Sequence, residues 1–293
     1  MPEARRLRIR AELSLILLTV VWGSTFVMVK DALGDASTLL FLAIRFGLAF
    51  VVLLALFRGG EWLGRDWRTE LKAGALVGTL LFSGYLFQTW GLLYTSAAKS
   101  GFLTGMNIAF VPLLGALLYR KNPQISEWLG IAVAVVGMAL LTLDGASLKV
   151  SRGDWLTLVC ALAFSLHLLA LNRYSPRVSY RNLSILQVGI AALLALATFS
   201  WAEPVRLSWT PRLLIALGVT SVFATAMAFS LMTWAQRHTT PTRAAVLFSL
   251  EPVVALITSH LLAGEVLKAQ AGWGAALILV GILLVELKPF RVA

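Results

Sequence analysis

Cysteine and charge are both scarce in this chain of 293 residues. There is one cysteine, Cys160, which excludes an internal disulfide and a cysteine-based metal site. Charged residues make up 13% of the chain and hydrophobic residues 59%, whereas soluble domains carry about 25% charged and about 45–50% apolar residues. So little charge cannot cover a water-exposed surface, and the composition therefore indicates a protein whose solvent is the lipid bilayer.

Catalytic and nucleotide-binding motifs are also missing. No segment matches the GxxxxGK[ST] pattern of phosphate-binding loops, so the sequence does not indicate an ATPase. The three histidines, His167, His238 and His260, fall in different apolar blocks and form no ligand cluster at helical spacing. We therefore expect no metal, no cofactor and no catalytic residue. A lipid-modifying membrane enzyme is a remote alternative, because it would need clustered acids and bases near an interface.

What the chain does have is long apolar runs joined by short polar segments. Each run is near the ~20 residues that a helix needs to cross the hydrocarbon core. The ten runs are residues 12–30, 38–57, 72–92, 100–119, 126–143, 154–171, 183–201, 212–234, 243–262 and 269–287. The sequence thus predicts an all-α integral membrane protein with ten transmembrane helices.

The basic residues predict how these helices are oriented. If the N-terminus is cytoplasmic, 17 of the 25 lysines and arginines lie in inside segments, 7 lie outside, and Arg45 lies within the second run. This bias places both termini in the cytoplasm and the protein in the plasma (bacterial inner) membrane. The net charge of +11 implies no nucleic-acid partner, because anionic lipid headgroups attract a basic face.

The chain also resembles itself at a nearly constant offset. The matched pairs are Trp67 with Trp209 at 142 residues, Pro112 with Pro252 at 140, and GIAVAVVG (130–137) with GAALILVG (274–281) at 144. Small changes in the offset fit a diverged duplication. Because each half has an odd number of spans, the two halves must be inserted in the membrane in opposite orientations. We predict two inverted five-helix repeats, residues 1–147 and 148–293, in one membrane domain. Such repeats place a binding site near the midplane, as in carriers.

Four motifs carry a resemblance to a known family. They are WGSTFVMVK (22–30), AIRF with Arg45, TSAAKSGFLTGMNIAFVPLL (95–114) and FSLEPVVALITSHLLAGE (248–265). With them the chain resembles the drug/metabolite transporter superfamily, in its EamA-type branch of ten spans, over nearly its whole length. Within that branch it looks most like the YddG-type exporters of aromatic and other amino acids. The small four-span relatives carry a proton-handling glutamate in span 1. No carboxylate lies between Glu12 and Asp31 here, so their proton coupling is not implied.

Polar and aromatic residues in the middle of apolar runs are the candidate site residues. In the first run Gly23 and Ser24 fit close helix packing, whereas Trp22 is either packed core or a pocket wall, with Thr25 on the same inward face. Some further candidates occupy matched positions in the two predicted repeats, and others lie beside a predicted helix break. The predicted substrate-binding residues are Trp22, Thr25, Tyr85, Gln88, Asn107, Phe110, His167, Met227 and Ser230.

The reasons differ from residue to residue. Tyr85 and Gln88 share a helical face, and at an offset of 142 they match Met227 and Ser230. Asn107 and Phe110 precede Pro112, which we expect to break its helix beside a cavity. The last candidate, His167, has no such motif beside it. His167 is either a hydrogen-bonded core residue or a protonatable gate.

Two ionisable residues lie deep in the predicted spans. Glu251 precedes Pro252 and is either a cap on the proline break or a coupling group. Arg45 is expected to be structural and bonded to neighbouring carbonyls, because the resemblance to the EamA-type branch implies that span 2 lies outside the central site.

The inventory of candidate side chains favours one class of substrate. Amides and hydroxyls suit the carboxylate and ammonium of a zwitterion, while aromatic and thioether surfaces accept varied side chains. We therefore expect an exporter of neutral amino acids, aromatic ones included, with broad selectivity. The alternatives are an exporter of nucleosides, sugars or toxic compounds on the same fold and, more remotely, a channel.

Overall fold

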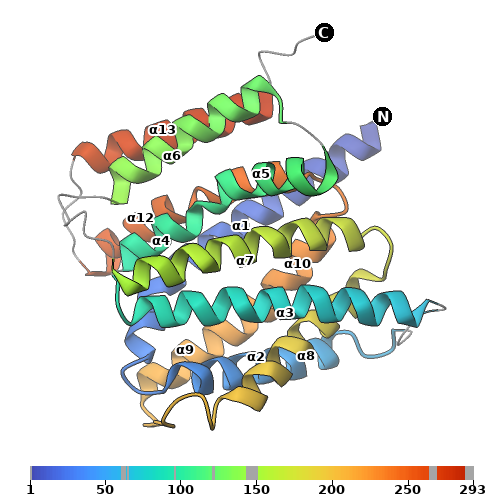
Figure 1. The fold of residues 1–293 in the computed structure, drawn as a ribbon, viewed down its shortest axis with the longest axis vertical. Coiled ribbons are helices and arrows are strands. Elements are labelled where there is room, and N and C mark those ends of the chain that lie inside the picture. Colours follow the sequence, from blue (N-terminus) through green and yellow to red (C-terminus); the bar gives the residue numbers. More distant parts are fainter. Residues whose placement is uncertain are drawn as a thin grey trace.

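A computed structural model describes residues 2–60, 64, 66–95, 97–120, 123–142, 151–263 and 269–287 (Figure 1). These residues form helices, and their one β-type contact is an isolated bridge between Ala36 and Leu207. The helices are α1 Pro2–Ala32, α2 Thr38–Leu56, α3 Trp67–Leu92, α4 Ala97–Gly105, α5 Asn107–Tyr119, α6 Ile125–Thr142, α7 Arg152–Tyr174, α8 Tyr180–Thr198, α9 Pro211–Ser221, the π-helix η1 Val222–Met227, α10 Ala228–Ala235, α11 Pro241–Phe248, α12 Glu251–Ala263 and α13 Ala269–Leu287. The all-α prediction is confirmed for this part of the chain.

Polar caps fix where several apolar helices begin. At the start of α7 the Asp154 amide donates to Ser151 Oγ at 3.2 Å, and the Ser151 amide donates to Asp154 Oδ2 at 2.7 Å. This reciprocal pair satisfies two amides that the first turn leaves without helical partners. Helix α9 begins with the capping hydroxyl of Thr210 followed by Pro211, and α11 begins in the same way after Thr240.

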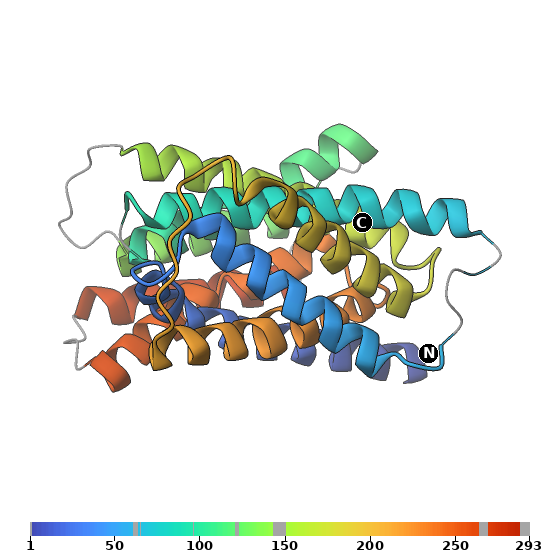
Figure 2. The ribbon, with the colours of Figure 1, turned by 90° about the horizontal axis from the view of Figure 1, so that it is seen from below.

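The helices run side by side along one direction and form an elongated bundle (Figures 1 and 2). Helix α3 packs between α7 and α8, and α2 packs on α8. Helices α6 and α13 form a pair at one edge of the bundle, while α2, α8 and α9 lie at the opposite edge (Figure 1). The first residues of α1 and the last residues of α13 lie at the same end.

Glycines bring α6 and α13 into backbone contact. A Cβ atom built on Gly130 would lie 2.6 Å from the Gly281 carbonyl oxygen, and one on Gly137 would lie 2.7 Å from that of Gly274. Small residues allow this approach between helices in a membrane. The two segments that match each other in sequence at an offset of 144 therefore pack against each other in antiparallel directions.

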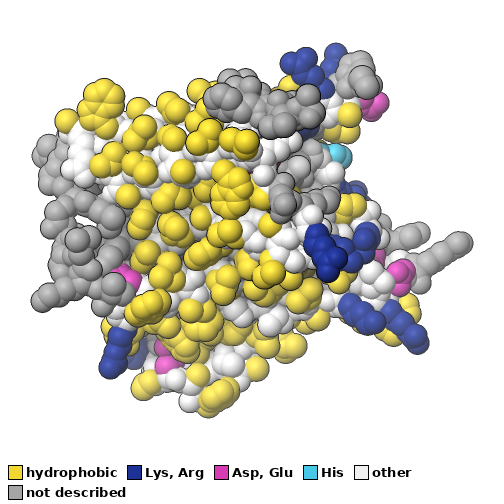
Figure 3. All heavy atoms as spheres, turned by 45° about the horizontal axis from the view of Figure 1, so that its top comes forward, with side chains coloured by type: hydrophobic (Ala, Val, Ile, Leu, Met, Phe, Trp, Pro, Cys, Tyr) yellow, Lys and Arg dark blue, Asp and Glu magenta, His cyan; other side chains and the backbone are white. Residues whose placement is uncertain are grey.

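The surface between the two ends of the bundle is apolar. Figure 3 shows hydrophobic side chains over the middle of this face, with lysines and arginines gathered toward the ends. Within the described ranges, six segments are long and apolar enough to cross a membrane: Glu3–Ala32, Thr38–Leu56, Ser100–Tyr119, Arg152–Tyr174, Tyr180–Thr198 and Pro211–Ala235. Two apolar helices, Ile125–Leu140 and Ala269–Val285, are shorter. All ten predicted runs fall on helices, and the crossing of ten spans stays a prediction.

Two of the predicted spans are each built from two helices. The first break is at Met106, between α4 and α5, and the second is at Ser249 and Leu250, between α11 and α12. At both breaks the amides reach back three residues: Met106 donates to the Leu103 carbonyl at 3.2 Å, and Leu250 donates to the Leu247 carbonyl at 3.2 Å. These tight turns end one helix and let the next begin.

The prediction that Pro112 breaks its helix is wrong. Pro112 is the sixth residue of α5, and the helix continues through it to Tyr119. The missing amide costs one bond to the Ile108 carbonyl, which the surrounding helices tolerate. Pro252, in contrast, is the second residue of α12, where the amide has no helical partner and proline fits without loss.

Candidate functional site

Helices from both halves of the chain enclose one cavity near their middle. Its lining comes from α1, α2, α3, α4, α5, α7, α10, α11 and α12. The lining residues are Trp22, Thr25, Phe26, Val29, Arg45, Tyr85, Gln88, Leu92, Thr104, Asn107, Phe164, His167, Leu168, Phe229, Met232, Phe248 and Glu251. Both helix breaks thus meet this cavity, because Asn107 and Glu251 are the first residues of α5 and α12.

Aromatic rings form a continuous wall. The Trp22 ring lies 5.7 Å from that of Phe229 and 5.3 Å from that of Phe248. The Tyr85 ring lies 5.3 Å from that of Phe164 and 6.1 Å from that of Phe229. Centroid separations of this size are typical of favourable edge-to-face and tilted ring pairs. The wall therefore offers a large apolar surface to an organic ligand.

The π-helix η1 holds two cavity residues through one carbonyl. The Ala228 amide donates to the Phe223 and Thr225 carbonyls, so the Ala224 carbonyl lacks the bond it would accept in an α-helix. Instead Trp22 Nε1 donates to Ala224 O at 2.9 Å, and Arg45 Nη2 donates to it at 3.4 Å. A buried carbonyl must be paired in the absence of water, and these two donors pair it.

Arg45 is held by three further contacts. Its Nε donates to Thr225 Oγ1 at 2.9 Å, and its Nη2 donates to the Tyr85 hydroxyl at 3.1 Å. The guanidinium carbon also lies 4.4 Å from the centroid of the Tyr85 ring, a cation–π contact. The expected carbonyl contact is present. The expectation that Arg45 lies outside the central site is wrong, because α2 carries it into the cavity wall.

Glu251 stands at the N-terminus of α12, directly after the break. The positive end of the helix dipole favours a carboxylate at this position. Gly23 of α1 lies against it: a Cβ atom built on Gly23 would be 2.7 Å from the Glu251 carbonyl oxygen and 2.9 Å from Val254 Cβ. The predicted packing role of Gly23 is confirmed, since only a glycine permits this approach of α1 and α12.

The other polar side chains of the lining are partly paired among themselves. Gln88 Nε2 donates to Thr104 Oγ1 at 3.3 Å, and the Thr25 hydroxyl donates to the Trp22 carbonyl at 2.9 Å. His167 Nε2 shares a hydrogen bond of 3.0 Å with Gln187 Oε1. The amide oxygen of Asn107 is buried without a partner in the described structure.

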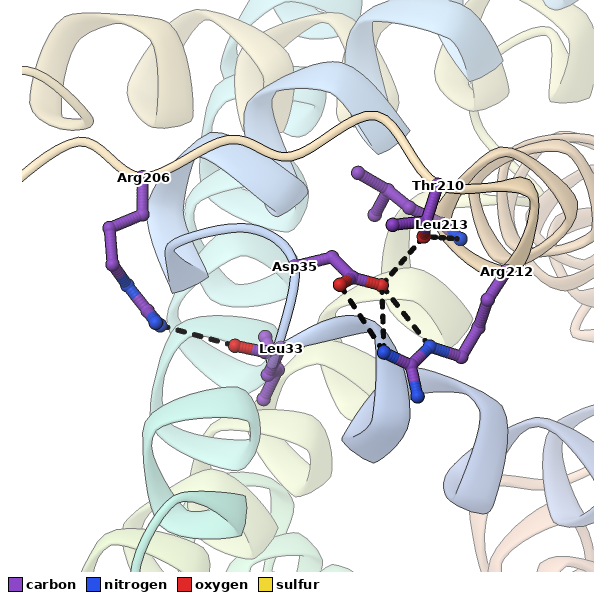
Figure 4. Close-up of polar contacts among 6 residues, drawn as sticks. All are labelled: Leu33, Asp35, Arg206, Thr210, Arg212 and Leu213. Carbon is purple, nitrogen blue, oxygen red and sulfur yellow. Dashed lines mark hydrogen bonds and ion pairs between the residues drawn. The ribbon is translucent and has the colours of Figure 1, made fainter.

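Polar contacts join the two halves at the ends of the bundle. At one end Asp35, between α1 and α2, accepts from Thr210 Oγ1 at 2.7 Å and from Arg212 Nε at 3.1 Å, while Arg206 donates to the Leu33 carbonyl at 3.2 Å (Figure 4).

At the other end Glu70, near the start of α3, accepts from Asn182 Nδ2 at 2.9 Å and from the Ser179 amide at 3.5 Å. Arg237 donates to the Ser175 carbonyl at 2.6 Å. Both ends are thus tied by contacts between segments far apart in sequence.

Comparison with known proteins identifies this architecture. The model of the EamA-like transporter family matches the chain twice, over residues 9–143 and 151–287. The chain belongs to the EamA-like transporter family. It is therefore a multi-pass membrane protein of a transporter family.

Relatives of this EamA-like transporter carry similarly general names. An "Uncharacterized transporter" of Archaeoglobus fulgidus is 33% identical over 281 residues, which cover 96% of this chain and 87% of that protein. "Uncharacterized inner membrane transporter YedA" of Escherichia coli is 25% identical, with 94% and 90% covered. One solved structure, titled "Crystal structure of protein", shares the fold with a TM-score of 0.78 at 20% identity, covering 95% of this chain and 96% of its own.

The cavity of the EamA-like transporter contains many of the predicted site residues. Those on its lining are Trp22, Thr25, Tyr85, Gln88, Asn107, His167 and Glu251. Phe110, Met227 and Ser230 are not on it. Phe110 is the fourth residue of α5, three residues after Asn107 and two before Pro112.

The π-helix explains why the second-half partners were misplaced. Tyr85 and Gln88 are matched on the lining by Phe229 and Met232, two residues beyond Met227 and Ser230. Met227 and Ser230 were predicted from an offset of 142, whereas the residues on the lining stand at an offset of 144. The wider turns of η1, which accommodate additional sequence, lie directly before them. The offset of 144 seen for the glycine segments would have found both residues.

Proposed function

We propose that this membrane transporter exports neutral amino acids, aromatic ones included, with broad selectivity and by alternating access. One observation carries the proposal: among the described residues, a cavity lined from both halves combines an aromatic wall with Arg45 and Glu251. Small-molecule sites are typically apolar pockets with a few convergent polar groups that fix orientation. A zwitterion with a variable apolar side chain suits this combination.

The proposed binding residues divide by the part of the substrate they meet. Trp22 and Tyr85 would contact the substrate side chain through their rings, while Thr25, Gln88, Asn107 and His167 would supply hydrogen bonds. Soft aromatic walls support broad selectivity, because they fit side chains of different shape without requiring one pattern of polar contacts.

We also propose that the two halves are inverted repeats with both termini in the cytoplasm. The two family matches begin at residues 9 and 151 and end at residues 143 and 287, offsets of 142 and 144. The contacts of Gly130 with Gly281 and of Gly137 with Gly274 support inversion, since they show that the matched helices pack side by side in antiparallel directions. Reporter fusions after residue 65 test the orientation: a cytoplasmic reporter should be active there, and an active periplasmic one contradicts the proposal.

Transport by purified protein in liposomes tests the substrate. We expect saturable counterflow of labelled phenylalanine, with competition by methionine and threonine. Empty liposomes measure the background. If none of the three amino acids is carried or competes, while a nucleoside or sugar does, the amino-acid proposal is wrong. Flux that does not saturate and shows no counterflow would instead indicate a channel.

Glu251 is the proposed coupling group. It is the one carboxylate among the described residues of the lining, and an ionisable group at such a place is a functional hypothesis by default. An imposed pH gradient should drive substrate movement in the wild type and fail to do so in Glu251→Gln. A variant that transports normally at every pH would remove Glu251 from this role.

A further inference from the structure

The cavity presents a guanidinium and a carboxyl group that do not pair with each other. Arg45 comes from α2 in the first half and Glu251 from α12 in the second. Throughout the described structure no ion pair or hydrogen bond joins them. Charges this far from water are costly unless they are paired, so an arrangement that keeps them apart requires an explanation.

Each charged group retains capacity for a ligand. In Arg45 the Nε and Nη2 atoms bond to Thr225, Tyr85 and Ala224, but Nη1 donates to none of the described residues. Nη1 is also absent from the fully buried atoms that lack partners, so it is reachable from the cavity that Arg45 lines. A guanidinium offers five donors in a planar fork, and the unused side of that fork suits a carboxylate.

The Glu251 carboxylate is free in the same sense. It accepts no hydrogen bond from any residue described, and its oxygens are not sealed in the protein. Close packing of Gly23 against the Glu251 backbone carbonyl fixes the start of α12, and the α12 dipole supports a negative charge there. The backbone of Glu251 is thus held in place, and both carboxylate oxygens are available to donors on a ligand.

We propose that Arg45 binds the carboxylate of the substrate and Glu251 binds its ammonium group, so that the cavity selects zwitterions by their two charged ends. This rests on the proposed function and deepens it, because it assigns each end of the amino acid to one residue. The aromatic wall of Trp22, Phe229 and Phe248 then receives the side chain. In the complex, the ion pairs with the substrate would compensate for the cost of burying the two charges.

Competition with three related compounds tests the assignment in proteoliposomes. L-Phenylalanine carries both charges, phenethylamine only the amine, and 3-phenylpropionate only the carboxylate. In the wild type we expect each single-charge compound to compete with labelled phenylalanine about 30-fold more weakly than unlabelled phenylalanine, because one buried charge is left unpaired.

The two variants should change the relative competition strengths of these three compounds in opposite directions. Glu251→Gln should weaken phenylalanine and phenethylamine by about 30-fold and leave 3-phenylpropionate unchanged or better. Arg45→Gln should weaken phenylalanine and 3-phenylpropionate and spare phenethylamine. The exposed residues Glu3 and Arg177 provide the matched controls, since Glu3→Gln and Arg177→Gln remove the same charges outside the cavity and should alter neither order.

Folding does not obscure the result. Arg45→Gln removes donors from Thr225, Tyr85 and Ala224 and is checked by size-exclusion chromatography, but Glu251→Gln removes no contact that the structure describes. The competition measurements with Glu251→Gln are therefore sufficient to test the assignment. If Glu251→Gln transports phenylalanine and weakens all three compounds equally, or none, the assignment is overturned and the amino-acid function stands. If the wild type binds none of the three, both fall.

Discussion

In the proposed repeat, the third helix of the first half corresponds to a second-half segment of different construction. α3 runs without interruption from Trp67 to Leu92, whereas the second-half segment changes from α9 into the π-helix η1 before continuing as α10. Ser83 donates to the carbonyl of Thr79, four residues back, at 2.9 Å. Thr225, at an offset of 142, donates to that of Thr220, five residues back, at 2.8 Å.

That one-residue difference gives the second-half segment contacts to cavity residues that α3 lacks. The wider turn releases the Ala224 carbonyl and directs Thr225 at Arg45, while the matching turn of α3 offers neither group. The proposed amino-acid substrate has two unlike ends, and two identical halves would not bind both of them selectively. The local difference at η1 supplies an asymmetry that such a substrate would require.

The largest expected effect lies where the halves are most alike. Leucine at Gly137 would meet the Gly274 carbonyl at 2.7 Å, and leucine at Gly281 would meet the Gly130 carbonyl at 2.6 Å. Each should separate α6 from α13 and destabilise the protein by about 1–3 kcal/mol or more, measured as lost folded yield and a lower melting temperature in detergent. Gly272→Leu, with no atom within 4 Å of the added Cβ, is the control. Unequal losses of stability from Gly137→Leu and Gly281→Leu would contradict the equivalence of α6 and α13.

The contact between α1 of the first half and α12 of the second tests whether transport depends on the position of Glu251. Gly23→Val places side-chain atoms where the Glu251 carbonyl and Val254 now lie, 2.7 and 2.9 Å from the added Cβ. α12 must shift, and Glu251 with it, so we expect the initial rate of phenylalanine transport to fall at least ~10-fold, consistent with a displacement costing about 1–3 kcal/mol. Gly47→Val in α2, where a Cβ meets nothing within 4 Å, should transport normally. A Gly23→Val protein with wild-type rates would show that the position of Glu251 is unimportant.

Replacing the two matched hydroxyls sharpens the comparison of α3 with η1. Thr225→Val keeps the shape of the side chain and removes the acceptor of Arg45 Nε, a bond to a charged group worth about 1.5–3 kcal/mol. We expect the KM for phenylalanine to rise several-fold with the maximal rate less affected. Ser83→Ala in α3 removes a hydroxyl that bonds only its own helix and should leave KM unchanged. Equal effects of the two substitutions would remove the functional distinction between the turns.

The smallest effect belongs to the ion pair at the end of the bundle. The Thr210 hydroxyl first, and Arg212 next, hold the pKa of Asp35 below its ordinary value, against a burial that would raise it. A carboxylate with a lowered pKa contributes stability above its ordinary pKa, and loses it as pH falls through the folded-state value. Asp35→Asn should lower the melting temperature slightly at pH 7 and not at low pH, because the Arg212 side chain is 57% exposed and such pairs are weak. A loss that persists at low pH would point to the hydrogen bonds alone.

The sequence predicted the residues that stand out against an apolar background. Trp22, Tyr85 and His167 are polar or bulky residues in the middle of long apolar runs, and the cost of burying them in lipid makes an inward position the expected one. Arg45 obeys the same rule, yet it was assigned to structure alone, because the family resemblance implied that span 2 lies outside the site. The Ala224 carbonyl that Arg45 contacts beside the cavity is freed by η1, which the sequence pattern did not predict.

Other parts could not be read from local pattern. Met227 and Ser230 were chosen at an offset of 142 from Tyr85 and Gln88, but the residues on the lining, Phe229 and Met232, lie at an offset of 144, directly after the π-helix. The break at Met106 carries no proline or paired glycines to announce its position, and it depends on how α4 and α5 pack against the rest of the bundle. Periodicity predicts where a helix lies in the chain, but its rotation about its own axis depends on the exact hydrogen-bond register.

The shared carbonyl of Ala224 makes two parts of the cavity mechanically dependent. Trp22 on α1 and Arg45 on α2 both end on one oxygen atom that belongs to a third segment, so this segment cannot move away from one of them without changing its bond to the other. If the protein works by the proposed transport cycle, we expect the aromatic wall and the guanidinium to loosen or tighten in the same step. A substrate bound as proposed would then be released from both at once, without an intermediate that is held by a single end.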